Sequence, residues 1–96
     1  MEENRINEVP PSKTGKHVII DYYRGSMGLL VTEADDGILY VSARSIGDIN
    51  VQVIMERFNG GGHANVAGAQ LKDKKKEDFF VELKQVLKEM TEAGDI

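Results

Sequence analysis

The sequence has 96 residues, one domain's worth of chain, of which 41% are hydrophobic and 29% charged, the composition of an ordinary folded protein. It contains no cysteine and only two histidines, which excludes disulfide scaffolds, thiol nucleophiles, thiolate zinc sites and histidine-rich metal sites. Twelve Lys and Arg against sixteen Asp and Glu give a net charge of -4, which disfavours a long nucleic acid as partner. No apolar run is long enough for a membrane span, and the polar N-terminus lacks the apolar core of a signal peptide, so a cytoplasmic setting is the default expectation.

The first sixteen residues differ in composition from the rest of the chain. They are polar and include Pro10, Pro11 and Gly15, which is typical of a flexible lead-in or a linker. We therefore expect two parts, a flexible N-terminal segment over residues 1–16 and a folded domain over residues 17–96.

The sequence of the first half of the domain predicts three strands. The β-branched and aromatic run from His17 to Tyr23 predicts the first strand, and two glycines within residues 24–28 predict a turn after it. Residues 29–34 and 38–44 predict the next two strands, which form a hairpin around an Asp-Gly turn.

Apolar residues then recur at helical spacing in two places. Asp48 is placed to cap the first helix and Gly60 to end it in a left-handed conformation. A short strand of small residues is predicted over residues 66–71. A second helix is predicted over residues 77–92, with acidic residues in its first turn and Gly94 at its exit. The apolar positions are Val51, Ile54, Met55 and Phe58 in the first helix, and Phe79, Phe80, Leu83, Val86, Leu87 and Met90 in the second.

The most unusual feature lies between the first helix and the short strand. Gly60, Gly61 and Gly62 are consecutive, and His63 and Asn65 follow them. Bare backbone at three positions allows amide groups to converge on an anion, and we expect a positive φ at Gly61. The imidazole and the carboxamide offer further hydrogen bonds to a phosphate or a base edge. The alternative interpretation is an ordinary glycine turn with an exposed histidine.

Arg44 and Ser45 follow the third predicted strand, and loop residues at strand ends often contact ligands. The arginine suits bidentate recognition of a phosphate; the alternative is an exposed arginine paired with Asp48 or Glu56. The four lysines within residues 72–76 indicate a solvated loop rather than a nucleic-acid patch. No pair of carboxylates stands out as a general acid and base, and no serine has the setting of a nucleophile elbow, so no catalytic residue is predicted.

Residues 41–71 resemble the DHH-associated C-terminal domain of the DHH phosphoesterase family, most closely that of the GdpP-type cyclic-di-AMP phosphodiesterases. The resemblance rests on a Ser-Ala-Arg-Ser run, a Gly-Asp-Ile-Asn-Val run and a Gly-Gly-Gly-His run, in this order. It implies an α+β domain with a small mixed β-sheet of four or five strands and two helices, which binds the nucleotide substrate. The residues that it implies for binding are Arg44, Ser45, Gly60, Gly61, Gly62, His63 and, more weakly, Asn65.

The same resemblance implies that the catalytic chemistry lies outside this chain. In that family a preceding DHH domain holds the manganese ions and the attacking water, so we expect no cofactor in this chain and no turnover by the chain alone. Residues 21–24, Asp-Tyr-Tyr-Arg, look like the family's Asp-His-His-Arg signature with tyrosine in place of both histidines. We interpret them as part of the first strand.

The implied ligand is cyclic di-AMP or the linear adenine dinucleotide, and the implied partner is a DHH catalytic domain in the same chain or another. Full-length relatives of this type are membrane-anchored with this domain in the cytoplasm, so we expect a cytoplasmic location without direct membrane contact from this segment. Two functions stay open: the substrate-binding domain of a cyclic-di-AMP phosphodiesterase, and a non-catalytic nucleotide-sensing or interaction module. A metal-bearing domain on a partner chain would favour the first, and affinity without such a partner would favour the second.

Overall fold

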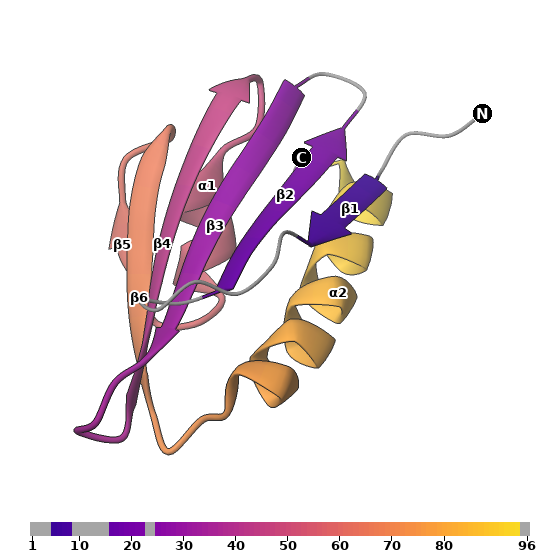
Figure 1. Cartoon of the computed structure of the whole chain (residues 1–96). Helices are drawn as coiled ribbons and strands as arrows, with labels where there is room; N and C mark the ends of the chain where they lie inside the picture. The colour runs from indigo at the N-terminus through magenta and orange to yellow at the C-terminus, as the bar shows by residue number, and fades with distance from the viewer. Residues whose placement is uncertain (1–4, 9–15, 23–24, 95–96) are drawn as a thin grey trace.

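The computed structural model describes residues 5–8, 16–22 and 25–94, which form one β-sheet and two helices (Figure 1). The strands are β1 (Arg5–Glu8), β2 (Lys16–Tyr22), β3 (Gly25–Glu33), β4 (Ile38–Gly47), β5 (Gly61–Gly62) and β6 (Val66–Lys72). The helices are α1 (Val51–Glu56) and α2 (Lys76–Ala93). The predicted α+β class with two helices is confirmed.

The strands lie in the order β1-β2-β3-β4-β6-β5, and every neighbouring pair is antiparallel. The described residues thus form six strands, where the resemblance implied a mixed sheet of four or five. The two additional strands lie at the sheet edges, where backbone groups make the pairing and side-chain patterns give little sign of it. β5 has only two residues, and β1 lies in the N-terminal segment that its composition assigns to a flexible lead-in. Residues 1–4 and 9–15 of that segment lie outside the described residues.

Strands β2 and β3 revise two predicted boundaries. β2 includes Asp21 and Tyr22, as expected for a strand, and residues 23 and 24 lie outside the described residues. β3 begins at Gly25, so this glycine and Gly28 belong to a strand rather than to the predicted turn. The β2–β3 register pairs both of them with residues of β2, a backbone contribution that the low strand propensity of glycine does not predict.

The hairpin between β3 and β4 confirms the prediction from the Asp-Gly turn. The Gly37 amide donates to the Ala34 carbonyl (3.2 Å), and the Ala34 amide donates to the Ile38 carbonyl (3.1 Å). Gly37 has a φ of 81°, which glycine adopts without steric cost. β4 continues to Gly47, beyond the predicted end at residue 44.

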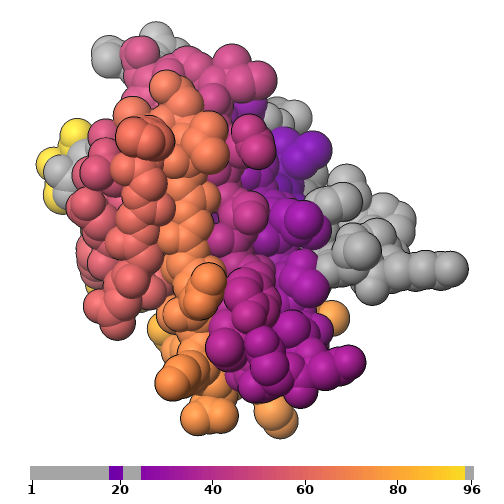
Figure 2. Space-filling model, turned by 90° about the vertical axis from the view of Figure 1, so that its left-hand side faces the viewer, coloured from indigo at the N-terminus to yellow at the C-terminus, as the bar shows by residue number. Residues whose placement is uncertain are grey.

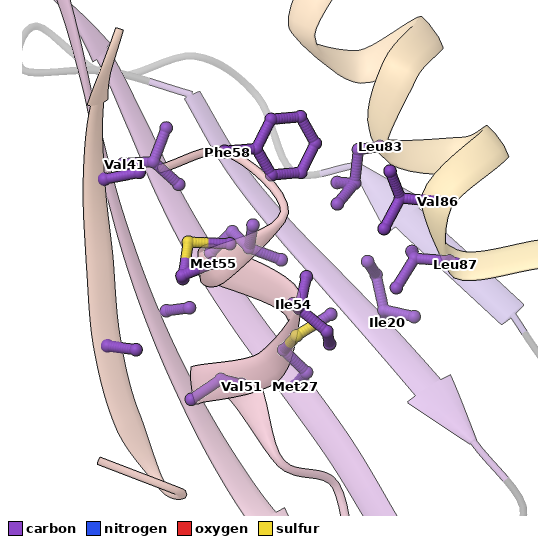
Figure 3. Packing of buried hydrophobic residues seen from close by; sticks show 14 of the residues in the cluster. Ile20, Met27, Val41, Val51, Ile54, Met55, Phe58, Leu83, Val86 and Leu87 are labelled. Carbon is purple, nitrogen blue, oxygen red and sulfur yellow. The ribbon is translucent and has the colours of Figure 1, made fainter. Parts of the chain in front are cut away.

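Both helices pack against the same face of the sheet, which we call the covered face (Figure 1). α1 contacts β4, β5 and β6, and α2 contacts β3. Leu83, Val86 and Leu87 of α2 point toward the sheet near Ile20 of β2 (Figure 3). The strand residues buried on this face are Val18, Ile20, Met27, Leu29, Val31, Leu39, Val41, Ala43, Ala67 and Ala69. Their alternation along each strand is that of a sheet with one buried face.

The start of α1 corrects the predicted cap. The N-cap is Asn50, whose side-chain oxygen accepts hydrogen bonds from the amides of Gln52 (2.9 Å) and Val53 (3.3 Å). Asp48 lies two residues earlier and is exposed, so the prediction of Asp48 as the cap is wrong. Both residue types are good caps, and only the path of the chain after β4 decides between them.

The end of α1 also differs from the prediction. The helix ends at Glu56, and the left-handed residue that follows is Asn59, with a φ of 62°, rather than Gly60. The Gly60 amide donates to the Met55 carbonyl at 2.8 Å and so completes the helix terminus. The predicted apolar positions of this helix, Val51, Ile54, Met55 and Phe58, are all buried.

Helix α2 agrees closely with its prediction. Glu77 and Asp78 lie in its first turn, where they favour the positive end of the helix dipole, and Gly94 is the left-handed C-cap with a φ of 82°. Phe79 is fully buried and Phe80 is partly buried beside the core, as predicted for core and flank positions. No helix in the described part of the chain is both long enough and apolar enough to cross a membrane.

The lysine run before α2 forms contacts within the domain. Lys74 makes an ion pair with Glu82, and the Lys76 ammonium lies 3.9 Å from a carboxylate oxygen of Glu33. The other carboxylate oxygen of Glu33 accepts a hydrogen bond from the Lys76 amide at 3.1 Å, so a β3 side chain satisfies a donor at the start of α2. The run is therefore only in part the predicted loop, because Lys72 ends β6 and Lys76 begins α2.

The opposite face of the sheet, which we call the open face, carries no helix among the described residues. Figure 2 shows parts of β3, β4 and β6 side by side at this surface. Three of the exposed large hydrophobic residues lie there: Ile19, Ile46 and Val66, with exposed fractions of 43%, 76% and 45%. The open face therefore exposes apolar side chains that no described helix covers.

Candidate functional site

Residues 60–65, which we call the glycine loop, include a tight hairpin between β5 and β6. The His63 amide donates to the Val66 carbonyl (2.7 Å), and the Val66 amide donates to the His63 carbonyl (3.3 Å). These two bonds close a loop of only two residues, Ala64 and Asn65. Gly61 and Gly62 are therefore part of an edge strand, and Gly60 leads into it from the end of α1.

This hairpin leaves few of the loop amides available to an anion. The Gly60 amide is bound to the Met55 carbonyl, and the His63 amide to the Val66 carbonyl. An anion would take up either donor only by breaking a hydrogen bond of the fold. Any anion bound here therefore depends more on side-chain donors than on a nest of amides.

The three glycines have different reasons for being glycine. A Cβ atom at Gly60 would lie 2.1 Å from the Gly68 carbonyl oxygen, and one at Gly62, where φ is 145°, would lie 2.5 Å from the Val66 carbonyl oxygen. At Gly61 a Cβ atom would meet nothing within 4 Å, and φ is not positive, so the predicted positive φ there is wrong. Steric contacts therefore require glycine at positions 60 and 62. At position 61 the fold has room for a side chain.

Ser45 and Asn65 hold the hairpin against the end of β4. The Asn65 carboxamide donates to the Ser45 hydroxyl (3.1 Å), which donates to the Ala64 carbonyl (3.3 Å). The Ser45 amide donates to the Asn65 carbonyl (3.0 Å), and the Val51 amide at the start of α1 donates to the Ala64 carbonyl (2.8 Å). The structure thus brings these two predicted site residues together, and their observed bonds position the hairpin.

Arg44 and His63 lie in one row across the open face, which we call the Arg44 row. The register places Gly28 beside Arg44 and Arg44 beside Val66, and Val66 pairs with His63. Paired residues of antiparallel strands point to the same face. With about 4.8 Å between neighbouring strands, the backbones at Arg44 and His63 are about 10 Å apart.

Arg44 is exposed and forms no ion pair or hydrogen bond with another described residue. The alternative pairing with Asp48 or Glu56 is therefore not found. His63 is also exposed. Among the described residues, the Arg44 row thus holds a cation without an ion-pair partner and an imidazole on the same surface.

Two shallow hollows flank the Arg44 row on the open face, and both reach Ser42. The larger, of about 690 Å³, extends over β4, β6 and the glycine loop, and the smaller, of about 460 Å³, extends over β2, β3 and β4. The residues lining the larger hollow are Tyr40, Val41, Ser42, Asn59, Gly60, Gly61, Gly68, Ala69 and Gln70. The smaller one is lined by Val18, Ile19, Gly28, Leu29, Leu30, Ser42 and Arg44.

At the margin of the larger hollow, Tyr40 is held by an acidic residue of the hairpin turn. Its hydroxyl donates to the Asp36 carboxylate at 2.8 Å, and the Ile38 amide donates to the same carboxylate at 3.0 Å. The Ile38 bond, followed by the Tyr40 bond, lowers the pKa of Asp36, and the bond to Asp36 raises the pKa of Tyr40.

Gly28, Ser42 and Gly68 are open-face residues that the sequence analysis did not place in the site. Ser42 carried a usable signal, because it lies two residues before Arg44 in a strand and therefore points to the same face. Gly28 carried no such signal, because two glycines within residues 24–28 predict a turn.

A protein-family model described as the DHHA1 domain matches residues 18–89. The matched region runs from β2 into α2 and includes all seven candidate residues. The resemblance stated for residues 41–71 is thereby confirmed.

Curated relatives agree with this match. The cyclic-di-AMP phosphodiesterase GdpP of Geobacillus thermodenitrificans (strain NG80-2) is 43% identical over 65 residues, which cover 68% of this chain and 10% of the relative. The cyclic-di-AMP phosphodiesterase PdeA of Listeria monocytogenes serotype 1/2a (strain 10403S) is 54% identical over 44 residues, 46% of this chain and 7% of the relative. GdpP of Bacillus subtilis (strain 168) is 39% identical over 64 residues, 67% of this chain and 10% of the relative. The chain thus matches at most a tenth of the length of these relatives.

Proposed function

This chain belongs to the DHHA1 domain family, and we propose that it is the nucleotide substrate-binding domain of a cyclic-di-AMP phosphodiesterase. The observation that carries the proposal is the Arg44 row, where a guanidinium with no partner among the described residues and an exposed imidazole share the open face beside the bare backbone of Gly61. The names of the relatives supply the substrate class.

In this proposal the Arg44 row holds the phosphates. The Arg44 guanidinium offers a planar fork of donors that matches two phosphate oxygens, and a His63 ring nitrogen donates one further hydrogen bond. Gly61 allows the ligand to approach the backbone without a side chain in the way. Ser45 and Asn65 fix the hairpin that carries His63, and direct ligand contacts from these two side chains remain a prediction.

The hydrolytic step is assigned to another domain. Among the described residues, no three His, Cys, Asp or Glu side chains lie together as a group that could hold a metal ion. We propose that a DHH domain, in the same chain or in a partner, holds the manganese and the attacking water. The 96-residue chain with added manganese is then expected to leave cyclic di-AMP intact, and turnover that disappears in a site variant of this chain would contradict this assignment.

The binding role is tested by calorimetric titration of the chain with cyclic di-AMP, the linear adenine dinucleotide and AMP. His63→Ala removes one donor to a charged group and is expected to lower the affinity for the dinucleotide about ten- to a hundredfold, and Arg44→Ala, which removes the donor fork, is expected to lower it by at least as much. Lys84→Ala is the charge-matched control for the arginine variant, because Lys84 is an exposed residue of α2. Its affinity is expected to equal that of the wild type.

Thermal melts of the same variants separate binding from folding. Arg44 and His63 are exposed, so neither substitution is expected to change stability appreciably. Folded variants that both keep wild-type affinity would remove the Arg44 row from the site. A wild-type chain that binds none of the three ligands would overturn the proposed function.

A further inference from the structure

The smaller hollow on the open face contains a strand glycine that the fold does not require. A Cβ atom at Gly28 would meet nothing within 4 Å, and the residue has no positive φ. Gly68 on the same face differs, because a Cβ atom there would lie 2.7 Å from the Val41 carbonyl oxygen. Glycine inside a strand lowers stability relative to residues with side chains, so the bare backbone at Gly28 has no structural benefit.

The surroundings of Gly28 form a slot with two kinds of wall. The register places Ile19 of β2 on one side of Gly28 and Arg44 of β4 on the other. Leu30, two residues along β3, points to the same face and also lines this hollow. Ile19 is 43% exposed, so part of its side chain is accessible to a ligand lying on the backbone of Gly28.

These walls suit a flat aromatic ring. The aliphatic side chains of Ile19 and Leu30 can make apolar contacts with the ring and leave its polar atoms free for other hydrogen bonds. The Arg44 guanidinium can stack on an aromatic ring or donate to its acceptor atoms. The Ser42 hydroxyl, also in the lining of this hollow, adds a donor and an acceptor for a ring edge.

From this geometry we infer that the slot over Gly28, bounded by Ile19, Leu30 and Arg44, is a binding subsite for one purine base of the dinucleotide. The inference rests on the proposed function and adds a location for the base. A base in the slot lies next to Arg44, so the phosphate attached to it reaches the phosphate-binding part of the Arg44 row. The absence of a side chain at Gly28 then leaves space for the ring to contact the backbone.

The inference is tested with the full 96-residue chain and cyclic di-AMP as the probe. Gly28→Val fills the slot with a side chain that strands accommodate well, and it is expected to lower the affinity at least tenfold while the melting temperature stays unchanged or rises. Thr32→Val is the matched control, because Thr32 lies on the same strand and the same face, beyond the residues that line the hollow. It is expected to bind like the wild type.

A second measurement does not depend on how a variant folds. Methyl NMR spectra of the wild-type chain are recorded during the titration, and the ring current of a base in the slot shifts the methyl signals of Ile19 and Leu30 but not those of Val81 on α2. Binding by the wild-type chain without these shifts overturns the base subsite and leaves the proposed function standing. The same conclusion follows if the folded Gly28→Val variant binds cyclic di-AMP with wild-type affinity. A wild-type chain that fails to bind removes the proposed function itself.

Discussion

The two faces of the sheet differ in what their side chains do. The covered face carries large aliphatic residues that pack under both helices, including Ile20, Met27 and Leu39, each at most 1% exposed. On the open face, bare or small residues lie at Gly28, Ser42 and Gly68, with large apolar residues only around them. The hydrophobic core is therefore built on one face alone, and the other face is available for recognition.

The glycines make the same distinction at the level of single residues. Gly60 and Gly62 are fixed by close approach to β6, whereas Gly28 and Gly61 have open space above the Cα atom. A glycine that the fold requires says nothing about a ligand, since any substitution would disturb the fold first. A glycine that the fold does not require, on the same face as an exposed arginine, is the kind of position where we propose that a ligand approaches the backbone.

The largest effect is expected for a substitution in the core above the covered face. Phe79 is fully buried, and its ring centroid lies 4.9 Å from that of Phe58. Phe79→Ala removes a large buried side chain and leaves a cavity, so it should lower the free energy of unfolding by about 3–5 kcal/mol. Ile46→Ala on the open face is the control, and its effect should stay within about 0.5 kcal/mol because Ile46 is 76% exposed. Urea denaturation measures both, and similar losses in the two variants would contradict the division between the faces.

A smaller effect is expected within the glycine triplet. Gly62→Ala forces a side chain into a positive-φ conformation against β6, which should cost about 1–3 kcal/mol. Gly61→Ala places a methyl group in open space and should be neutral or stabilise the chain by about 0.4–1 kcal/mol, because alanine restricts the unfolded state. Thermal melts compare the two variants directly. The opposite order of stabilities would show that the hairpin does not have the geometry described.

The sequence predicts local features of this domain better than non-local ones. The spacing of Phe79, Leu83 and Val86 and the cap at Gly94 define α2 without tertiary information, and the Asp-Gly turn defines the central hairpin. The edge strands β1 and β5 escape prediction, because their pairing is made by backbone groups, and neither segment has a side-chain pattern typical of a strand.

The same limit applies to the candidate site. Arg44 and His63 are identifiable as residue types with suitable chemistry, but their common row results from the register between β4 and β6 and from the hairpin at residues 63–66. The role of Gly28 depends on its neighbours in β2 and β4. Only the folded sheet distinguishes such a residue from a turn glycine.

The smallest effect concerns acid stability at the margin of the open face. The Asp36 carboxylate accepts hydrogen bonds from the Ile38 amide and the Tyr40 hydroxyl, and these bonds lower its pKa in the folded state. A carboxyl group with a lowered pKa stabilises the fold above its unfolded-state pKa, and this contribution is lost as the pH falls through the folded-state value. The loss therefore begins below about pH 4. It should be slight, because Asp36 is exposed and solvent screens the interaction.

NMR titration of the Asp36 carboxyl carbon in the wild type and in Tyr40→Phe tests this contribution. The variant lacks the hydroxyl but keeps the ring, so only one of the two hydrogen bonds is lost. The Asp36 pKa should rise in the variant and still lie below its ordinary value, because the Ile38 amide continues to donate. Equal midpoints in the two proteins would mean that Tyr40 does not bind Asp36 in solution, and the open face would then lose one of the contacts that fix the edge of its larger hollow. A raised midpoint would instead sharpen the contrast between the faces: polar bonds between exposed groups order the rim of the open face, and apolar burial holds the covered one.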